Sequence, residues 1–292
     1  MICQGRVVVV TGAGQGLGRA HALALAAEGA AVVVNDLGEA AKSVVEEITG
    51  RGGTAVADLG DVSDWGYAEA LVRRAVEEFG VLHALVNNAG VNRDRMLVSM
   101  TEADWDLVLR VDLKGHAAPL RHAAAYWREC AKSGRPVAAR IVNTSSGAGL
   151  SGSVGQGNYG AAKAGIAALT VIAAAELARY GVTVNAIAPS ARTPMTEAVE
   201  AFAERMRAPE SGFDAMHPGN VSPLVVWLAS AGSGSVSGRV FEVEGGTISV
   251  ADGWQHGPRV ERDRRWEPGE VGAAVTELLA RAPDPAVVYG SG

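Results

Sequence analysis

The stretch that decides the fold is VVVVTGAGQGLG, which runs from Val7 to Gly18. Its four β-branched residues, Val7–Val10, are typical of a parallel strand that is buried on both faces. A glycine-rich turn follows at once, and Arg19–Glu28 then has the composition of a helix. A second apolar run, Ala31–Asn35, completes a strand, helix, strand unit, which is the building block of open parallel sheets.

The same alternation of strand and helix patterns continues along most of the chain. Such regularity favours right-handed crossovers and helices on both faces of the sheet. The sequence therefore predicts an α/β protein: a doubly wound Rossmann-type fold with a seven-stranded, mostly parallel sheet in a single domain. The expected strands are Val7–Val10, Ala31–Asn35, Ala55–Ala57, Ala84–Asn87, Ala139–Asn143, Thr183–Ile187 and Val240–Val243.

The size and composition of the chain suit one large core. It has 292 residues, of which 48% are hydrophobic and 20% charged. We expect residues 1–251 to form the dinucleotide-binding and catalytic domain, with a substrate-covering loop at about 193–219. Residues 252–292, rich in Arg and Pro, are expected to form a polar C-terminal extension.

Charge and cysteine content argue against several classes of partner. The net charge of -6, without a basic cluster, disfavours nucleic acid. The apolar stretches, such as Ile166–Ala175, fall short of the roughly 20 residues that span a membrane. Cys3 and Cys130, without a secretory leader ahead of them, are expected to be free thiols in the cytoplasm. No metal site is predicted.

The glycine-rich turn is a candidate phosphate site. It joins the first strand to the first helix, where backbone amides and the helix dipole can face a pyrophosphate. Gly12, Gly16 and Gly18 lack the Cβ that would block such a ligand. A tight turn that only packs the helix closely is the structural alternative.

Asp36 adds a preference between cofactors. It ends the second strand 24 residues after Gly12, where a carboxylate can accept hydrogen bonds from the adenosine ribose hydroxyls. The same charge would repel a 2′-phosphate, and the neighbouring Gln15 and Leu37 carry no compensating charge. We therefore expect NAD rather than NADP. The alternative for Asp36 is an ordinary strand-end cap.

Tyr159 and Lys163 are four residues apart in a segment that can form a helix, so both side chains emerge on one face. An ammonium beside a phenol favours the phenolate form and brings proton transfer closer to working pH. Tyr159 is therefore the candidate general acid/base. Ser146 stands 13 residues before it, after a strand and Thr144-Ser145, where its hydroxyl can bind a substrate oxygen or merely cap a loop.

These motifs together resemble the short-chain dehydrogenase/reductase family over roughly residues 5 to 250. The resemblance rests on the glycine spacing, Asp61-Val62, Asn87–Gly90 and Tyr159–Lys163. It implies that Asp61 and Val62 bracket an adenine and that Lys163 also binds the nicotinamide ribose. For Asn88 alone, a structural role is the better interpretation. The predicted cofactor-binding residues are Gly12, Gln15, Gly16, Leu17, Gly18, Asp36, Leu37, Asp61, Val62, Asn88, Ala89, Gly90, Tyr159, Lys163, Pro189 and Thr193.

The resemblance also assigns the catalytic residues Ser146, Tyr159, Lys163 and Asp112. Ser146 matches the family spacing for the serine that orients the substrate, and Ser145 fits it less well. Many family members place an asparagine at the position of Asp112, where it supports a proton relay through water. The aspartate departs from that pattern, so its charge should alter the pH dependence if the side chain takes part.

Within the family, the sequence resembles the (3R)-hydroxyacyl-CoA dehydrogenase part of the peroxisomal multifunctional β-oxidation enzyme and its bacterial single-domain relatives. The similar segments are Val33–Gly38, Gly155–Tyr159, Pro189–Met195, Phe241–Val243 and Arg262–Trp266. The first hypothesis for the substrate is therefore a 3-hydroxyacyl thioester, either an acyl-CoA or a sterol side-chain CoA. Five arginines near the expected mouth suit CoA phosphates or are simply solvated: Arg93, Arg95, Arg192, Arg205 and Arg207.

Other functions compete with this one. A hydroxysteroid or other free secondary alcohol would suit the apolar 195–216 segment. A biosynthetic 3-oxoacyl reductase is disfavoured by Asp36, and a non-catalytic nucleotide-binding protein by the intact Ser146, Tyr159 and Lys163. The family resemblance further implies a homodimer or homotetramer, and the alanine-rich Ala117–Ala125 and Ala161–Ala175 suit close helix contacts.

Overall fold

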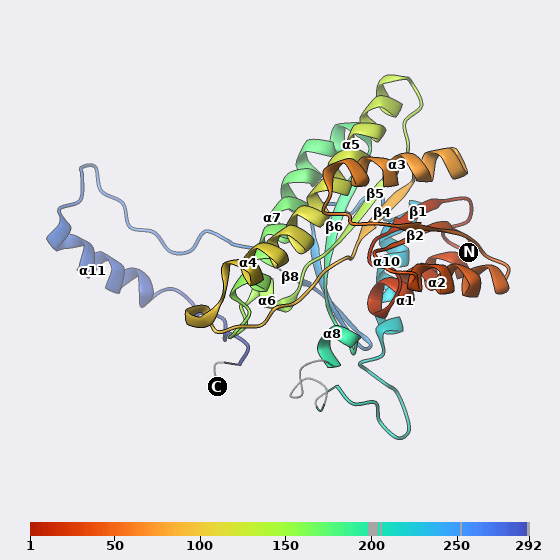
Figure 1. Cartoon of the computed structure of the whole chain (residues 1–292). Coiled ribbons are helices and arrows are strands. Elements are labelled where there is room, and N and C mark those ends of the chain that lie inside the picture. The colour runs from red at the N-terminus through yellow and green to blue at the C-terminus, as the bar shows by residue number, and fades with distance from the viewer. Residues whose placement is uncertain (198–203, 205, 252, 291–292) are drawn as a thin grey trace.

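The computed structural model describes residues 1–197, 204, 206–251 and 253–290. Its centre is a sheet of eight strands in the order β3-β2-β1-β4-β5-β6-β7-β8, parallel except for β8 (Figure 1). The α/β Rossmann-type fold is thus confirmed. The strands are β1 (Val7–Val10), β2 (Ala31–Asp36), β3 (Thr54–Leu59), β4 (Ala84–Asn87), β5 (Arg140–Thr144), β6 (Thr183–Ser190), β7 (Val240–Glu244) and β8 (Thr247–Ala251).

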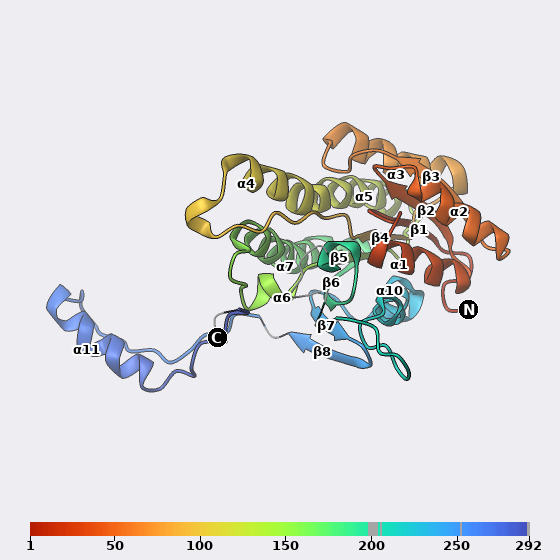
Figure 2. The same cartoon turned by 60° about the horizontal axis from the view of Figure 1, so that its bottom comes forward.

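Helices cover both faces of the sheet (Figure 2). One layer contains α1 (Gly16–Ala27), α2 (Ala40–Gly50) and α10 (Ser222–Ala229); the other contains α3 (Trp65–Phe79), α5 (Gly115–Lys132) and α7 (Gly157–Leu177). Alternation along β1 divides the core between the layers, since Val8 and Val10 face the first and Val7 and Val9 the second. The shorter helices are α4 (Glu102–Val108), α6 (Gly147–Leu150), α8 (Pro194–Glu197) and α11 (Pro268–Leu279).

The strand order determines where a ligand site can form at the edge of the sheet. β1 pairs with β2 on one side and with β4 on the other, so the chain crosses over at this point of the sheet. In open parallel sheets the crevice beyond the carboxyl ends of such strands is where ligands bind. The glycine turn after β1, Asp36 at the end of β2 and the loops after β4, β5 and β6 all reach this edge.

The expected number of seven strands is wrong, because the chain forms an eighth. β8 turns back on β7 through Gly245-Gly246, with Gly245 at a φ of +54°, and pairs antiparallel from Val240 to Ala251. It lies at the sheet edge, and its Ile248 and Val250 are half exposed. A Gly-Gly pair before an alternating β-branched run is a hairpin signal, and the expected strands did not include it.

The helix that carries the candidate catalytic residues is long and apolar. By length and composition alone, Gly157–Tyr180 is the one helix of the described residues that passes the test for a membrane span, a test that core helices of soluble proteins also pass. Its buried residues, among them Ala173, Ala174 and Leu177, pack in the core beside the sheet. We therefore describe it as a core helix of the fold.

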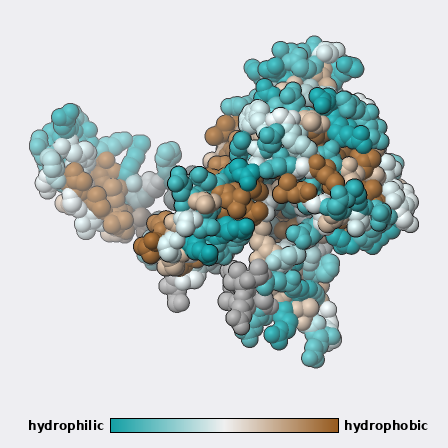
Figure 3. Space-filling view, viewed as in Figure 1, coloured by the Kyte–Doolittle hydropathy of each residue, from teal (hydrophilic) through white to brown (hydrophobic). Residues whose placement is uncertain are grey.

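The C-terminal extension leaves the body after β8 and returns to it. α11 stands away from the sheet in Figures 1 and 2, and none of its residues is buried. A helix was not expected here; Pro268 at its first turn and reciprocal hydrogen bonding between Glu267 and Glu270 account for its start. Apolar residues gather on part of its surface (Figure 3). The domain boundary at residues 251 and 252 stays a prediction.

Candidate active site

A cavity of about 1110 Å³ opens at the carboxyl edge of the sheet. Its walls bring together residues that are up to 278 positions apart in the chain, from Gly12 to Gly290. Of the predicted cofactor-binding residues, all line this cavity except Gly18. Of the predicted catalytic residues, Ser146, Tyr159 and Lys163 line it, and Asp112 lies behind Lys163.

The glycine turn shows why glycine is needed at its first position. Gly12 has a φ of +61°, and a Cβ there would lie 2.7 Å from the Cα of Ala89. At Gly18 a Cβ would lie 2.2 Å from the carbonyl oxygen of Gly12, so this residue lets α1 pack against the turn. Asn88 fixes the same turn, since its side-chain amide donates to the carbonyls of Thr11 and Gly12 at 3.1 Å each. The turn is therefore a rigid cradle.

Asp36 lies where the second strand meets this cradle. Its carboxylate accepts hydrogen bonds from the amides of Gly14 at 2.8 Å and Gly38 at 3.2 Å, one on each oxygen. A carboxylate oxygen has two acceptor positions, so each keeps one for a ribose hydroxyl. Leu37 beside it is 69% exposed and brings no charge.

Asp61 and Val62, which follow β3, also line the cavity. Arg110 makes an ion pair with Asp61 at 2.8 Å, and Ser63 donates to the same carboxylate. Burial opposes a charge on Asp61, but the hydrogen bonds from Ser63 and Arg110 outweigh it and hold the pKa of this carboxyl below its usual value. Asp61 is thus an ionised acceptor at the place where the resemblance expects an adenine.

The candidate catalytic pair, Tyr159 and Lys163, has the expected geometry. Tyr159 and Lys163 lie one turn apart on α7, and the Lys163 ammonium is 5.3 Å from the centre of the Tyr159 ring. Lys163 also donates to the carbonyl of Thr144 at 3.0 Å. Its side chain is only 3% exposed, so its charge acts in a poorly screened environment.

The two serines after β5 have different surroundings. Ser145 is 1% exposed, and its hydroxyl donates to the carbonyl of Lys163 at 2.9 Å, which fixes α7 against β5. Ser146 caps α6 and accepts a longer hydrogen bond, 3.2 Å, from the amide of Ala148. Its hydroxyl proton is not used by that contact. Ser146 is therefore the serine that can donate to a substrate oxygen.

Asp112 makes a direct ion pair with Lys163. Its carboxylate is completely buried and lies 3.1 Å from the Lys163 ammonium, and its other oxygen accepts from the amide of Val91 at 2.8 Å. It sits on a π-helical turn, Leu109–Lys114, between α4 and α5. Such turns are frequent at functional sites.

The charges of this pair depend on each other. Burial alone would lower the pKa of the Lys163 ammonium, but Asp112 and Tyr159 more than offset it and raise the pKa. Burial raises the pKa of Asp112, against the opposing effect of Lys163. His116, which is also buried here, has a pKa well below its usual value because of burial and the Lys163 charge, so it stays neutral. The ion pair is the main electrostatic feature behind Tyr159.

Several lining residues were not identified from the sequence. Met195, Met206 and Met216 face the cavity from the loop after β6, where the apolar composition of 195–216 was the only signal. Val154 and Tyr289 contribute from the loop after α6 and from the C-terminal extension. Nothing local in the sequence indicates that residue 289 reaches the site. The substrate side of the cavity is thus largely apolar.

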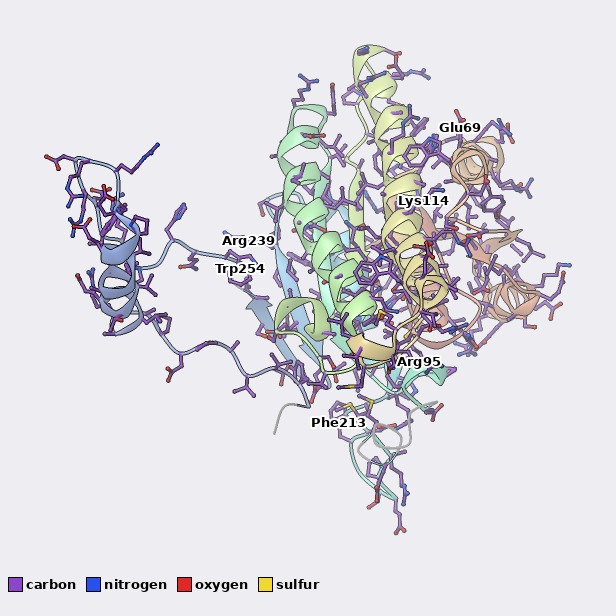
Figure 4. All side chains as sticks on the ribbon, turned by 60° about the vertical axis from the view of Figure 1, so that its left-hand side comes forward. Glu69, Arg95, Lys114, Phe213, Arg239 and Trp254 are labelled. Carbon is purple, nitrogen blue, oxygen red and sulfur yellow. The ribbon has the colours of Figure 1, made fainter. Side chains whose placement is uncertain are left out.

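Two of the five arginines expected near the mouth form ion pairs with other residues. Arg192 forms an ion pair with Asp214, and Arg95 lies 4.0 Å from Asp104. Figure 4 shows Arg95 and Phe213 at the same end of the molecule. Arg205 and residues 198–203 of the expected loop lie outside the described residues. No cluster of three or more His, Cys, Asp or Glu that could hold a metal occurs among the described residues.

Comparisons with known proteins agree with this geometry. The sequence matches the family model described as short chain dehydrogenase over residues 6–204. The hydroxyacyl-CoA dehydrogenase ChsB1 of Mycobacterium tuberculosis is 47% identical, over 94% of this chain and 89% of that protein. The peroxisomal multifunctional enzyme type 2 of Mus musculus is 42% identical over 84% of this chain, which corresponds to 32% of its own length.

A solved structure extends the likeness to the whole chain. The crystal structure of a short chain dehydrogenase from Mycobacterium avium superimposes with a TM-score of 0.92 at 59% identity and covers 100% of both chains. The chain therefore belongs to the short-chain dehydrogenase/reductase family. It is an oxidoreductase of a family that uses NAD or NADP.

Proposed function

We propose that this protein oxidises a 3-hydroxyacyl thioester to the 3-oxoacyl thioester with NAD as the hydride acceptor. The observation that carries the proposal is the convergence of Ser146, Tyr159 and Lys163 in one cavity with an apolar substrate side. A hydroxyacyl-CoA dehydrogenase that is 47% identical supports the choice of substrate class.

The residues present fit the cofactor. The cradle at Gly12 has no room for a Cβ, and both carboxylate oxygens of Asp36 keep an acceptor position for ribose hydroxyls. NAD, when bound, accepts the hydride from the alcohol carbon. A 2′-phosphate would meet the charge of Asp36 and the apolar side chain of Leu37, so these two residues support NAD over NADP.

The chain's own residues handle the proton and the charge. Tyr159 as phenolate takes the proton of the substrate hydroxyl, while the hydrogen on the same carbon departs as hydride and leaves a ketone. Ser146 donates a hydrogen bond to the substrate oxygen and stabilises its charge during transfer. Lys163 favours the phenolate through its ammonium, 5.3 Å from the ring, and is itself held by Thr144 and Asp112.

The apolar residues of the cavity support an acyl or sterol side-chain group. Met195, Met206 and Met216 offer flexible, polarisable side chains that adapt to an irregular hydrocarbon. The same lining would accept a free hydroxysteroid or another secondary alcohol, which is the second candidate. A thioester differs from it by its CoA group, so the two candidates are separated by dependence on CoA.

The test compares initial rates of NADH formation. Purified protein is given 3-hydroxyacyl-CoA substrates, free hydroxysteroids and simple secondary alcohols at equal concentration, each with NAD and with NADP. The proposal predicts the highest kcat/KM for a thioester with NAD. Faster oxidation of a free alcohol would establish the second candidate, and faster turnover with NADP would contradict the assigned role of Asp36.

We also propose that the protein works as a cytoplasmic homodimer or homotetramer. Val171 and Ile172 on α7 are 53% and 55% exposed. Ala164, Ala168 and Ala175 on the same helix are exposed too, and their small side chains permit close helix contact with a second copy. Cys3 and Cys130 are free thiols in the structure, which suits a reducing compartment. Light scattering of Val171→Glu against the unchanged protein tests the assembly, because a charge on that face should yield monomers.

A further inference from the structure

The described C-terminal end of the chain lies against the active site. After α11 the chain returns to the loop between α6 and α7, where residue 289 forms a parallel bridge with Ser153. The amide of Val154 donates to the carbonyl of Tyr289 at 2.9 Å, and the amide of Tyr289 donates to the carbonyl of Gly152 at 3.3 Å. Backbone pairing therefore holds this segment beside the cavity.

This pairing directs the Tyr289 side chain to the catalytic loop. A Cβ built on Gly147 would lie 3.2 Å from a ring carbon of Tyr289 and 3.6 Å from its hydroxyl oxygen. Gly147 directly follows Ser146, the residue proposed to bind the substrate oxygen. The ring thus covers the backbone next to the reacting centre, and both Tyr289 and Gly290 line the cavity.

The position of the ring restricts the space beside the substrate. Tyr289 stands on the side of the cavity formed by Ser153 and Val154, and the methionines after β6 also line the cavity. Tyr289 is 52% exposed, so part of its surface is available to a bound ligand. A flat, rigid side chain at such a place limits the width of a group attached to the reacting carbon far more than its length.

We propose that Tyr289 is a specificity-determining residue: it forms a wall of the acyl site beside Ser146 and Gly147 and limits how bulky the substrate can be near its hydroxyl-bearing carbon. This inference rests on the proposed function for the identity of the substrate, although the wall itself does not depend on the thioester. It assigns a role in the active site to the C-terminal extension, which lies outside residues 6–204 matched by the family model.

The experiment compares Tyr289→Ala with the matched control Tyr289→Phe. For each protein, kcat/KM is measured with a straight-chain 3-hydroxyacyl-CoA and with one that carries a methyl branch beside the hydroxyl-bearing carbon. Tyr289→Ala should raise the ratio of branched to straight substrate about tenfold, the usual effect of relieving one methyl-sized clash. Tyr289→Phe keeps the ring and should match the unchanged protein.

The Kd of NAD and the ratio of branched to straight substrate distinguish a role of Tyr289 in substrate selection from an effect on the cofactor site. The Kd of NAD, measured by fluorescence titration, should stay the same in both variants, because the proposed role of Tyr289 concerns the substrate only. A branched-to-straight ratio that is equal in all three proteins would overturn the proposal. If free alcohols rather than thioesters are oxidised, the proposed function fails, and the same ratio measured with branched and straight alcohols still decides the role of Tyr289.

Discussion

Replacement of Asp112 by asparagine tests the electrostatics behind Tyr159. The Lys163 ammonium lies 5.3 Å from the Tyr159 ring centre and 3.1 Å from the Asp112 carboxylate, so the carboxylate can be at most about 8.4 Å from the ring. A phenolate carries much of its charge on the oxygen, beyond the ring centre. At an effective dielectric of about 20, separations of this order give a repulsion of about 1 to 2 kcal/mol between the carboxylate and a phenolate. That energy corresponds to about one pH unit.

The sign follows from the charge that is removed. In alcohol oxidation the phenolate is the base, so the rate rises with pH as the phenolate forms. Asp112→Asn removes a negative charge and favours the phenolate, and His116 stays neutral and adds no charge of its own. The rising limb of the kcat/KM profile should therefore move about one pH unit lower in Asp112→Asn.

The assay is NADH formation from pH 5 to 10 with the best substrate. Asp106→Asn is the matched control, since it removes an exposed carboxylate from α4 and should leave the limb in place. Melting temperatures show whether the buried ammonium tolerates a neutral partner. A limb that moves upward would refute the reasoning, because it would mean that Lys163 loses its proton without Asp112.

Three further changes test other parts of the account. Tyr159→Phe should lower kcat at least about a hundredfold while the Kd of NAD stays unchanged; retained turnover would remove Tyr159 from its role as acid/base. Asp36→Ala should lower the NAD over NADP preference about tenfold or more in kcat/KM, and an unchanged ratio would exclude the ribose contact. His21 is buried, and burial lowers its pKa to about 3. Its protonation in the unfolded state below about pH 6.5 should therefore cost about 2 kcal/mol of stability at pH 5, and His21→Gln should flatten the fall in unfolding free energy between pH 6.5 and 5; an equal slope in denaturant melts would contradict this.

The parts of the fold that the sequence predicted are those fixed by local pattern. Runs such as Val7–Val10 are buried on both faces, so their composition alone identifies a central strand. β8 was not among the predicted strands, because it is an edge strand with polar and half-exposed residues. α11 was not predicted either, because it lies in a polar extension and has no buried face.

In the candidate site, too, the sequence predicted the residues that lie in local motifs and not the contacts between distant parts of the chain. The glycine cradle, Asp36 and the pair Tyr159 and Lys163 lie in short motifs whose spacing implies their geometry. Asp112 and Lys163 lie 51 positions apart in the chain, on two different helical segments, and the sequence showed only an unusual residue at position 112. Tyr289 reaches the site through tertiary pairing with Ser153, which no local pattern encodes.

The most direct test of the central claim follows the hydrogen that is transferred. A 3-hydroxyacyl-CoA carrying deuterium on carbon 3 is incubated with the enzyme and NAD, and the nicotinamide is analysed by mass spectrometry. We expect one deuterium in the reduced nicotinamide and a slower rate than with the undeuterated substrate. In Tyr159→Phe the labelled nicotinamide should form at least about a hundredfold more slowly. Reduced nicotinamide without deuterium, or no reaction of the thioester while a free alcohol is oxidised, would contradict this claim.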